Sequence, residues 1–436
     1  MTKQNDKKKK TAVKPIKKEI KKTTKKEKIV KEEKKESNTK SLIELLIIIA
    51  AIIIILVFFQ GSILCNIVVL LLILSVLIFV HEFGHYITGK MCGVHIYEFA
   101  LGMGPKVLGF RRKNDPTEYT LRALPIGGFC QLAGEEGEDD DKLPKDKFMC
   151  NKSKLQRSII LIAGVTMNFI TALVLLFMIS FVWGSTEQSS IIGVIEPNSP
   201  AEKAGIKVGD KIVECNGYNI SSWDKLTIVT NLKNKKDTYK YVVQSKDGKK
   251  TTYTLKPAKY IVVDGEYVEI TKEHTKEQIL KENNIKKSEA EEVKLIGIGA
   301  PTENKTGIIN AIKYAFKKFA SIVETMFLII GSLITGKLGL DALSGPVGMY
   351  TVVETVSAYG ISNIIYLMAY LSINLGVINI LPFPAFDGGR VVFIGIEALI
   401  GKKINPNVEA LIHNIGFFLI LGLMLYITLQ DIIRLF

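Results

Sequence analysis

One short motif in the sequence has residue types and a spacing that could bind a catalytic metal ion. His81, Glu82 and His85 form an H-E-x-x-H pattern directly after the apolar run 63–80. Two imidazoles at positions i and i+4 of a helix share one face, as a zinc ion requires, and the intervening glutamate can act as general base on a metal-bound water. The alternative, two interfacial histidines beside a solvated glutamate, would leave three ionisable groups at membrane depth without a use.

A catalytic zinc ion also needs a third protein ligand, and Asp387 is the candidate. It ends the segment Asn379-x-x-Pro-x-Pro-x-x-Asp387, which follows an apolar run and leads into two glycines. Prolines interrupt a helix, and irregular backbone at membrane depth is tolerated only where protein or a water-filled cavity surrounds it. An aspartate in an ordinary turn is the alternative, and the H-E-x-x-H motif argues against it. The other histidines have no ligand spacing to the motif and receive no role: His95, His274 and His413.

Long apolar segments that could position these residues indicate a membrane protein. Hydrophobic residues make up 47% of the 436. A helix of roughly 20 apolar residues can cross the hydrocarbon core of a bilayer. Runs near this length lie at 42–59, 63–80, about 158–183, about 361–381 and about 413–430. The amphipathic stretch 306–336 could be a surface helix or a further span, and its central lysines favour the surface.

The charge distribution argues against a nucleic-acid-binding protein. Lys and Arg number 57 against 43 Asp and Glu, but 17 of these bases and only six of the acids lie in residues 1–40. A Lys-rich run almost without aromatic residues is typical of a disordered tail, and the remaining chain is nearly neutral. We therefore expect the chain to lie in a lipid bilayer and not to bind nucleic acid.

The positions of the basic segments predict the membrane topology. The Lys-rich tail and the basic loop 90–157 should both be cytoplasmic, which requires two crossings between them. The runs 42–59 and 63 to about 88 supply these crossings. The next crossing places residues 185–305 outside, and the last two complete a five-crossing topology. The H-E-x-x-H motif then lies towards the cytoplasmic side of the cell membrane.

Together these residues resemble the site-2 protease family of intramembrane zinc metalloproteases, and most closely its bacterial PDZ-containing branch, the regulator-of-sigma-E protease type. The likeness covers about residues 63–436. Further motifs stand in the order of that family: F-A-L-G-M-G-P at 99–105, L-P-I-G-G-F at 124–129, A-G-V-T-M-N-F at 163–169, L-S-G-P-V-G at 343–348 and S-I-N-L-G at 372–376. The resemblance implies that Zn²⁺ is bound by His81, His85 and Asp387. It also implies that Glu82 is the base and that Asn379 helps to hold the substrate strand.

Two regions outside the metal motif also match the resemblance. Gly127, Gly128 and Phe129 follow the strand-like residues 119–124 and could form a hairpin, which in the family is a re-entrant β element that pairs with substrate. As a bare pattern, an ordinary cytoplasmic hairpin fits equally well. Residues of about 187–258 resemble a PDZ domain, with a strand, a short helix started by Ser-Pro and a Gly-Asp turn into the next strand. Such a domain could bind a peptide or act only as a steric plug.

We therefore predict a polytopic α-helical membrane protein with a site-2 protease core and an inserted extracytoplasmic PDZ-like α/β domain. The predicted parts are a Lys-rich cytoplasmic tail (1–40), an additional transmembrane helix (41–61), the first part of the catalytic core (62–184), an extracytoplasmic region with the PDZ-like domain (185–305), and an amphipathic helix with the second part of the core (306–436). The tail and the additional span depart from the common four-span pattern. The chain also carries one PDZ-like unit where some relatives have two. None of these departures touches the catalytic positions.

The predicted activity is that of a zinc endopeptidase that cleaves single-pass membrane proteins in or near their transmembrane segment. The resemblance implies that an upstream site-1-type protease acts first, and that the substrates include anti-sigma factors or remnant signal peptides. A catalytically silent, PDZ-bearing membrane adaptor is the main alternative, and the intact H-E-x-x-H motif and Asp387 argue against it. A zinc transporter is a third possibility, weakened by the lack of further spans that carry ligands.

The topology can be tested by cysteine labelling. A cysteine introduced near position 20 should resist a membrane-impermeant thiol reagent in intact cells and react after the membrane is permeabilised, because the Lys-rich tail is predicted to be cytoplasmic. Labelling of that cysteine from outside would contradict the five-crossing topology.

Overall fold

The computed structural model describes residues 50–135, 143–232, 237–263, 266–271, 275–283 and 292–435. The chain divides into two compact units, with the boundary between Lys152 and Ser153. The Lys-rich tail 1–40 lies outside the described residues. So does most of the run 42–59, of which residues 50–58 are helical.

The first unit contains one long apolar helix, α2 (Ile63–Met91). The side chain of Ser62 caps its start by accepting a hydrogen bond from the backbone N–H of Cys65 at 3.2 Å. Its mean hydropathy of 3.3 over 18 residues is high enough for a membrane span. The H-E-x-x-H motif lies ten residues or fewer from the C-terminal end of this helix.

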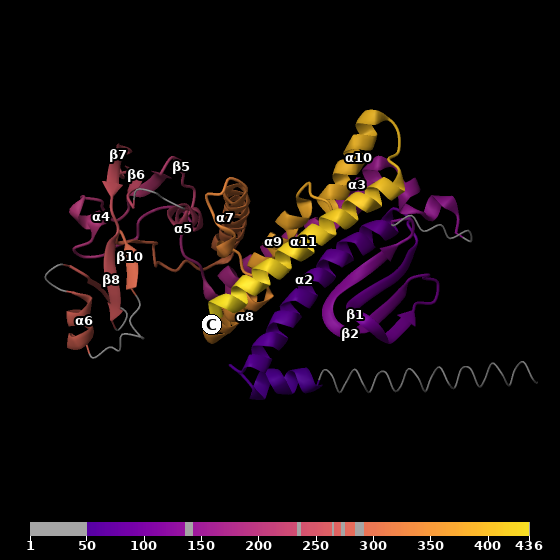
Figure 1. Cartoon of the computed structure of the whole chain (residues 1–436), viewed down its shortest axis with the longest axis horizontal. Coiled ribbons are helices and arrows are strands. Elements are labelled where there is room, and N and C mark those ends of the chain that lie inside the picture. The colour runs from indigo at the N-terminus through magenta and orange to yellow at the C-terminus, as the bar shows by residue number, and fades with distance from the viewer. Residues whose placement is uncertain are drawn as a thin grey trace, which may run out of the picture. The chain divides into compact units, whose positions relative to one another are not determined.

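A bent β-hairpin packs against α2. Its strands are β1 (Ile96–Arg111) and β2 (Glu118–Leu132). The first part of β1 pairs with both ends of β2, so that residues 98–101 have partners in 118–121 on one edge and in 128–131 on the other. The element is thus a small folded sheet (Figure 1). It is followed by two short 3₁₀ turns, η1 (Lys145–Lys147) and η2 (Met149–Asn151).

Helices make up most of the second unit outside its α/β region. They are α3 (Lys154–Trp183), α7 (Ile308–Ile334), α8 (Pro346–Ala358), α9 (Ile361–Ile380), α10 (Asp387–Ile400) and α11 (Pro406–Leu435), with the turn η3 (Leu340–Ala342). A buried cluster joins α3, α7 and α9, and includes Leu176, Ile322 and Ile373. The approach of α9 to α3 is close, because a Cβ on Gly376 would lie 2.4 Å from the ring of Phe169.

A separate α/β region is inserted between α3 and α7 (Figure 1). Its elements are β3 (Val194–Ile195), α4 (Pro200–Lys203), β4 (Lys211–Cys215), β5 (Tyr218–Asn219), α5 (Trp223–Asn231), β6 (Tyr239–Gln244), β7 (Lys250–Leu255), β8 (Ala258–Val263), β9 (Glu266–Glu269), α6 (Lys276–Glu282), β10 (Glu292–Leu295) and β11 (Ile298–Gly299). The sheets have the orders β5-β4-β6-β7, β10-β8-β9 and β11-β3. The expected strand, Ser199-capped helix and following strand are therefore present as β3, α4 and β4.

Strand β11 extends this region beyond the predicted range of 187–258. It pairs with β3, and Ile296 and Ile298 pack on the core formed by residues of β4, α5, β6 and β7. We call residues 187–232, 237–263, 266–271, 275–283 and 292–299 the external domain, after the side of the membrane that the sequence predicts for them.

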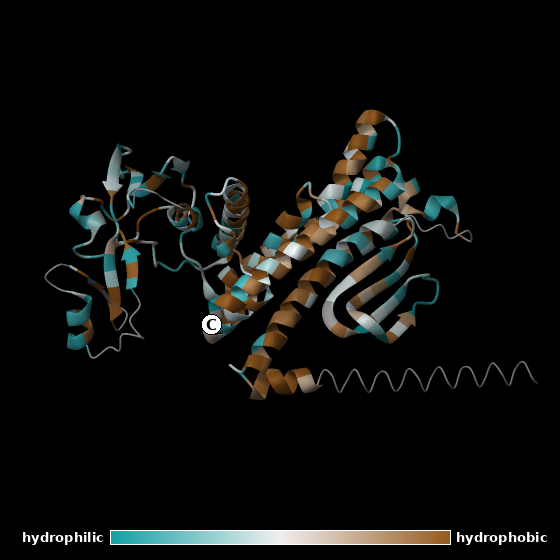
Figure 2. Ribbon diagram, in the orientation of Figure 1, coloured by the Kyte–Doolittle hydropathy of each residue, from teal (hydrophilic) through white to brown (hydrophobic). Residues whose placement is uncertain are grey.

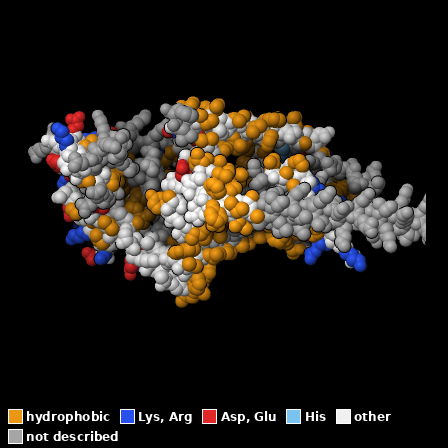
Figure 3. Space-filling model, turned by 90° about the horizontal axis from the view of Figure 1, so that it is seen from below, with side chains coloured by type: hydrophobic (Ala, Val, Ile, Leu, Met, Phe, Trp, Pro, Cys, Tyr) orange, Lys and Arg blue, Asp and Glu red, His pale blue; other side chains and the backbone are white. Residues whose placement is uncertain are grey.

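Four of the described helices are long and apolar enough to cross a membrane: α2, α3, α9 and α11. They coincide with four of the five runs predicted from the sequence. Figure 2 shows these helices mainly in hydrophobic colours and α6 in hydrophilic ones. Apolar side chains lie exposed over the helices in Figure 3, whereas charged side chains gather over the external domain. Because an exposed apolar helix surface of this length suits lipid, the chain is a membrane protein.

Glu397 makes a buried ion pair that ties α10 to α3. It is 4% exposed and accepts hydrogen bonds from the Arg157 guanidinium and, at 3.1 Å, from the backbone N–H of Ile404. Burial acts to raise the pKa of Glu397, but the hydrogen bonds from Arg157 and Ile404 outweigh it and hold the pKa below its usual value. The stability that this pair contributes should therefore be present at neutral pH and be lost as the pH falls.

We expect Glu397→Gln to destabilise the protein by about 3 kcal/mol, because it leaves the Arg157 charge buried without its partner. Thermal unfolding in detergent at pH 7 measures the effect. The control is Glu269→Gln, which removes the more exposed pair with Lys203 and should change the midpoint little. Equal midpoints for the two variants would contradict the prediction.

Candidate metal centre

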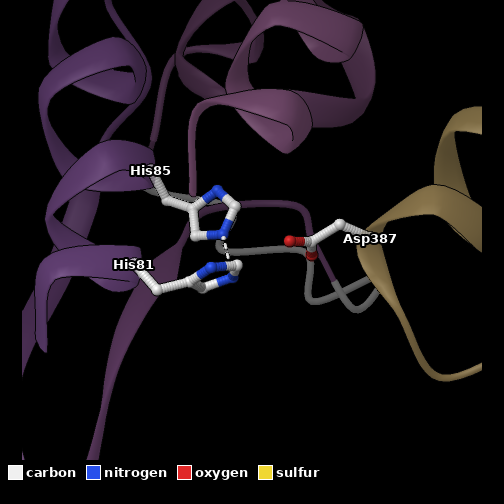
Figure 4. Close-up of side chains that lie close together, drawn as sticks. All are labelled: His81, His85 and Asp387. Carbon is white, nitrogen blue, oxygen red and sulfur yellow. Dashed lines mark hydrogen bonds between the residues drawn. The ribbon is translucent and has the colours of Figure 1, made fainter. Parts of the chain in front are cut away.

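The H-E-x-x-H residues lie on the inward face of α2. His81 and His85 are 7% and 8% exposed, and their Nε2 atoms are 3.1 Å apart. This spacing follows from the helix, since residues four apart share a face. Figure 4 shows the two imidazoles projecting to the same side of the helix. Two neutral imidazoles so close can both present a nitrogen lone pair to one ion.

Glu82 is held by the hairpin. Its Oε2 atom accepts a hydrogen bond of 3.0 Å from the backbone N–H of Cys130 in β2. The hydrogen bond fixes the direction of the Glu82 carboxylate, which lies between the two histidines of the motif in the sequence. It also places Gly127, Gly128 and Phe129, which directly precede Cys130, beside the same helix.

The two glycines allow the hairpin backbone to come close to its neighbours. Gly127 has φ +81°, a conformation that favours glycine, and a Cβ there would lie 3.7 Å from Ile78, one turn before His81. A Cβ on Gly128 would lie 2.6 Å from the carbonyl oxygen of Ala100. Side chains at either position would therefore disturb the packing of β2.

A polar cavity of about 500 Å³ adjoins Glu82 on the hairpin side. Across it, Arg122 makes a bidentate ion pair with Glu98 at 2.8 Å and lies 4.9 Å from the ring centre of Phe129. Burial raises the pKa of the Cys130 thiol above its usual value, with a contribution from the Glu82 charge. This thiol therefore stays protonated at neutral pH.

Asp387 begins α10 after a sharp turn that ends α9. Asn379 lies in the last turn of α9, half-buried, and residues 381–386 form the irregular connection. A Cβ on Gly388 would lie 2.3 Å from the carbonyl oxygens of Ile380 and Leu381. Glycine is thus required for the turn to fold back on the end of α9.

Helix α11 supports this turn through two residues that the sequence analysis did not assign. The Nδ1 atom of His413 accepts a hydrogen bond of 3.0 Å from the backbone N–H of Ala385. A Cβ on Gly416 would lie 2.5 Å from Pro384, so α11 touches the turn directly. His413 therefore has a structural role near Asp387. No spacing in the sequence could have revealed it, because the contact joins two segments 28 residues apart.

Donor atoms of His81, His85 and Asp387 lie within 4.8 Å of one another. Figure 4 shows the carboxylate of Asp387 pointing towards the two imidazoles. Two imidazoles and a carboxylate form a donor set that zinc accepts in catalytic sites.

Comparison with known proteins identifies the family of the chain. The profile of peptidase family M50 matches residues 69–423. The chain belongs to peptidase family M50. It is similar to the zinc metalloprotease RasP of Shouchella clausii (32% identical) and to that of Bacillus licheniformis (30%), with 84% of this chain and 98% of each relative covered. It is also similar to the regulator of sigma-W protease RasP of Bacillus subtilis (30% identical), with 84% of this chain and 97% of the relative covered.

Membership of the M50 family and the names of these relatives confirm two predictions made from the sequence. The protein is a zinc metalloprotease of the site-2 protease family, and its cofactor is Zn²⁺. The adaptor and transporter alternatives are set aside.

For this M50 peptidase we expect Gly388→Ala to lower the zinc content of the purified protein, because the added Cβ pushes against two backbone carbonyls and displaces the start of α10. Gly395→Ala is a matched control on the same helix, where a Cβ has open space. The control should retain full zinc and lose no stability, since alanine favours a helix over glycine. Full zinc in both variants, measured by metal analysis, would show that the turn does not position a ligand.

Proposed function

We propose that this protease cleaves single-pass membrane proteins within or near their transmembrane segment, using His81, His85 and Asp387 as zinc ligands and Glu82 as general base. The observation that carries the proposal is the position of the H-E-x-x-H motif. It lies on a helix whose apolar part is long enough to cross a bilayer. A metal-binding motif there serves a substrate that itself lies in the membrane.

The donor set supports zinc at these residues. Three protein ligands leave one coordination position open, as catalysis requires. When bound, Zn²⁺ polarises a carbonyl and lowers the pKa of water. The burial of both imidazoles keeps bulk solvent from competing for the ion, and the 3.1 Å approach of their Nε2 atoms suits neutral rings.

Glu82 performs the proton transfer in this proposal. A carboxylate adjacent to a ligand histidine can take the proton of the attacking water and pass it to the leaving amine. The N–H of Cys130 binds Oε2. This hydrogen bond holds one carboxylate oxygen in place and orients the other.

The hairpin and the end of α9 are proposed to bind the substrate strand. A transmembrane helix must unwind before its amide bond can react, and its freed backbone groups then need partners. Residues 128–131 form an edge of the described hairpin sheet, where an extended substrate could add as a further strand. Gly127, Gly128 and Phe129 would contact it there, with Asn379 as a side-chain donor or acceptor.

The external domain is proposed to be a PDZ-like unit that lies outside the cell and limits the size of what enters. Its β3, α4 and β4 follow the order expected of such a unit. No proposed ligand or base lies in it, so it can select substrates without taking part in the chemistry. A size filter would explain why an upstream site-1-type protease must act first. One relative is named a regulator of sigma-W protease, which favours anti-sigma factors among the substrates; remnant signal peptides are also proposed.

The proposed role of Glu82 is tested by Glu82→Gln. The variant should keep its fold and its zinc but lose at least about 99% of its activity towards a membrane substrate, since general base catalysis contributes a factor of about 100 or more. Glu277→Gln, exposed on α6, is the matched control and should remain active. Proteomics of cells that carry each variant should show membrane stubs accumulating only with Glu82→Gln. An active, zinc-loaded Glu82→Gln protein would remove this residue from the mechanism.

A further inference from the structure

The external domain meets α7 through a buried ion pair. Lys318 of α7 is 8% exposed, and its Nζ atom donates hydrogen bonds of 2.8 and 2.9 Å to the two carboxylate oxygens of Asp224 in the first turn of α5. Ser321 donates a further hydrogen bond of 2.6 Å to Asp224, and its hydroxyl lies 2.7 Å from that of Ser222. These four side chains form one connected polar network between the two helices.

This network fixes a geometry more than it adds stability. A buried ion pair recovers little more than the cost of desolvating its charges, whereas apolar side chains in the same place would bind α5 in several registers. The contact with Asp224, by contrast, joins both carboxylate oxygens to Lys318 and one of them to Ser321, so it is lost when α5 shifts along α7. A second pair, Lys225 with Glu324, joins the same helices, but Glu324 is much more exposed than Lys318.

Helix α7 carries this contact to the membrane helices. The same buried stripe of α7 packs into the cluster with α3 and α9 through Ala315, Ile322 and Met326, which lie three, four and eight residues from Lys318. The Lys318 ammonium also lies 5.3 Å from the ring centre of Tyr366 on α9. The attachment point of the external domain on α7 therefore also contacts α9, the helix whose last turn holds Asn379.

The chain enters and leaves the external domain at one point. Ser185 and Lys305 exchange backbone hydrogen bonds of 3.0 and 2.8 Å. Gly184 and Gly307, with φ +79° and +98°, flank this bridge. A Cβ at Gly307 would meet nothing within 4 Å, whereas one at Gly184 would lie 2.2 Å from the side chain of Asn304. Such a glycine-flanked two-strand bridge can act as a hinge. The domain thus has a hinge at Ser185 and Lys305 and a second attachment on α7. There the Asp224–Lys318 pair is accompanied by the contacts of Glu324 with Lys225 and Ser221 and by the more exposed Lys317–Glu187 pair.

Helix α5 also forms a wall of the external domain's cavity of about 720 Å³. Trp223, Leu226, Thr227 and Thr230 line it, next to the ion-paired first turn. Breaking the contact between Asp224 and Lys318 would therefore displace α5 from α7, and α5 forms one wall of this cavity.

We propose that the Asp224 and Lys318 pair is a latch that holds the external domain, about its hinge at 184–185 and 305–307, in the position in which it excludes substrates with long external parts. Asp224 and Lys318 are then positioning residues that set specificity for external length. The inference rests on the proposed function, in which the external domain is a size filter. The two hydrogen bonds from Lys318 to Asp224 hold the domain in the closed position, and the glycine backbone at the hinge lets the domain move when they break.

The test compares two substrates with the same transmembrane segment and either a long or a short external part. Each is cleaved by the full-length protein in liposomes, and the long-to-short ratio of cleavage rates is measured. Asp224→Ala should raise this ratio about tenfold, which corresponds to about 1.4 kcal/mol of lost discrimination. Lys318→Met should raise it less, because the Asp224 side chain is 30% exposed and can be solvated, whereas the Lys318 side chain is only 10% exposed. Lys318→Arg, which keeps the charge, should retain the wild-type ratio.

Lys313→Met is the matched control, since Lys313 is an exposed lysine on the same helix. It should leave the ratio unchanged. An unchanged ratio in both Asp224→Ala and Lys318→Met, with short-substrate cleavage intact, would overturn the latch. An equal loss of cleavage for both substrates would also overturn it. Failure of the wild-type protein to cleave the short substrate would instead reject the proposed function.

Hydrogen exchange provides a second measurement if Asp224→Ala does not fold. In Lys318→Met, the amides of α5 should exchange faster while those of α3 and α9 keep their wild-type protection, because only the attachment of the external domain is lost. Unchanged exchange in α5 would contradict the latch.

Discussion

The burial of two imidazoles on an apolar helix is the constraint on which the rest of the structure depends. Polar groups removed from water must find partners, and the low dielectric of a membrane protein interior raises the cost of leaving them unsatisfied. His81 and His85 lie on α2, where the surrounding side chains are almost all apolar. In the proposed metal centre, a bound cation and a carboxylate would satisfy both rings at once, so the cost of burying the rings would favour metal binding.

The proposed carboxylate ligand, Asp387, stands at the start of a helix that follows an irregular turn. The backbone of this turn, between α9 and α10, is packed by α11 at Pro384 and hydrogen-bonded by His413. The hairpin holds the Glu82 side chain in place through a hydrogen bond from the N–H of Cys130. In both cases, backbone that is not helical lies against protein, which is the condition under which it persists at membrane depth. The substrate would meet the same condition when it unwinds.

The sequence predicted the features that depend on local pattern. The spacing of His81 and His85 follows from helix geometry, and the four apolar helices follow from hydropathy. The short helix capped by Ser199 was predicted for the same kind of reason, since the cap and the following proline are adjacent in the chain.

Features that depend on contacts between distant segments were not predicted. His413 supports a turn 28 residues away, and nothing in its own neighbourhood marks it. Strand β11 joins the external domain from well beyond the predicted boundary, because its partner β3 lies about a hundred residues earlier. The central lysines of 306–336 favoured a surface helix over a further span, but the burial of Lys318 depends on Asp224, which lies 94 residues away in the chain.

X-ray absorption at the zinc edge of the full-length protein tests the account most directly. We expect the zinc in the wild type to have two imidazole nitrogens and oxygen donors at about 2.0–2.2 Å and no sulfur ligand. In Asp387→Ala, the protein oxygen donor should be lost and the zinc occupancy should fall. A sulfur ligand at about 2.3 Å, or an unchanged spectrum and full occupancy in Asp387→Ala, would contradict the proposed metal centre.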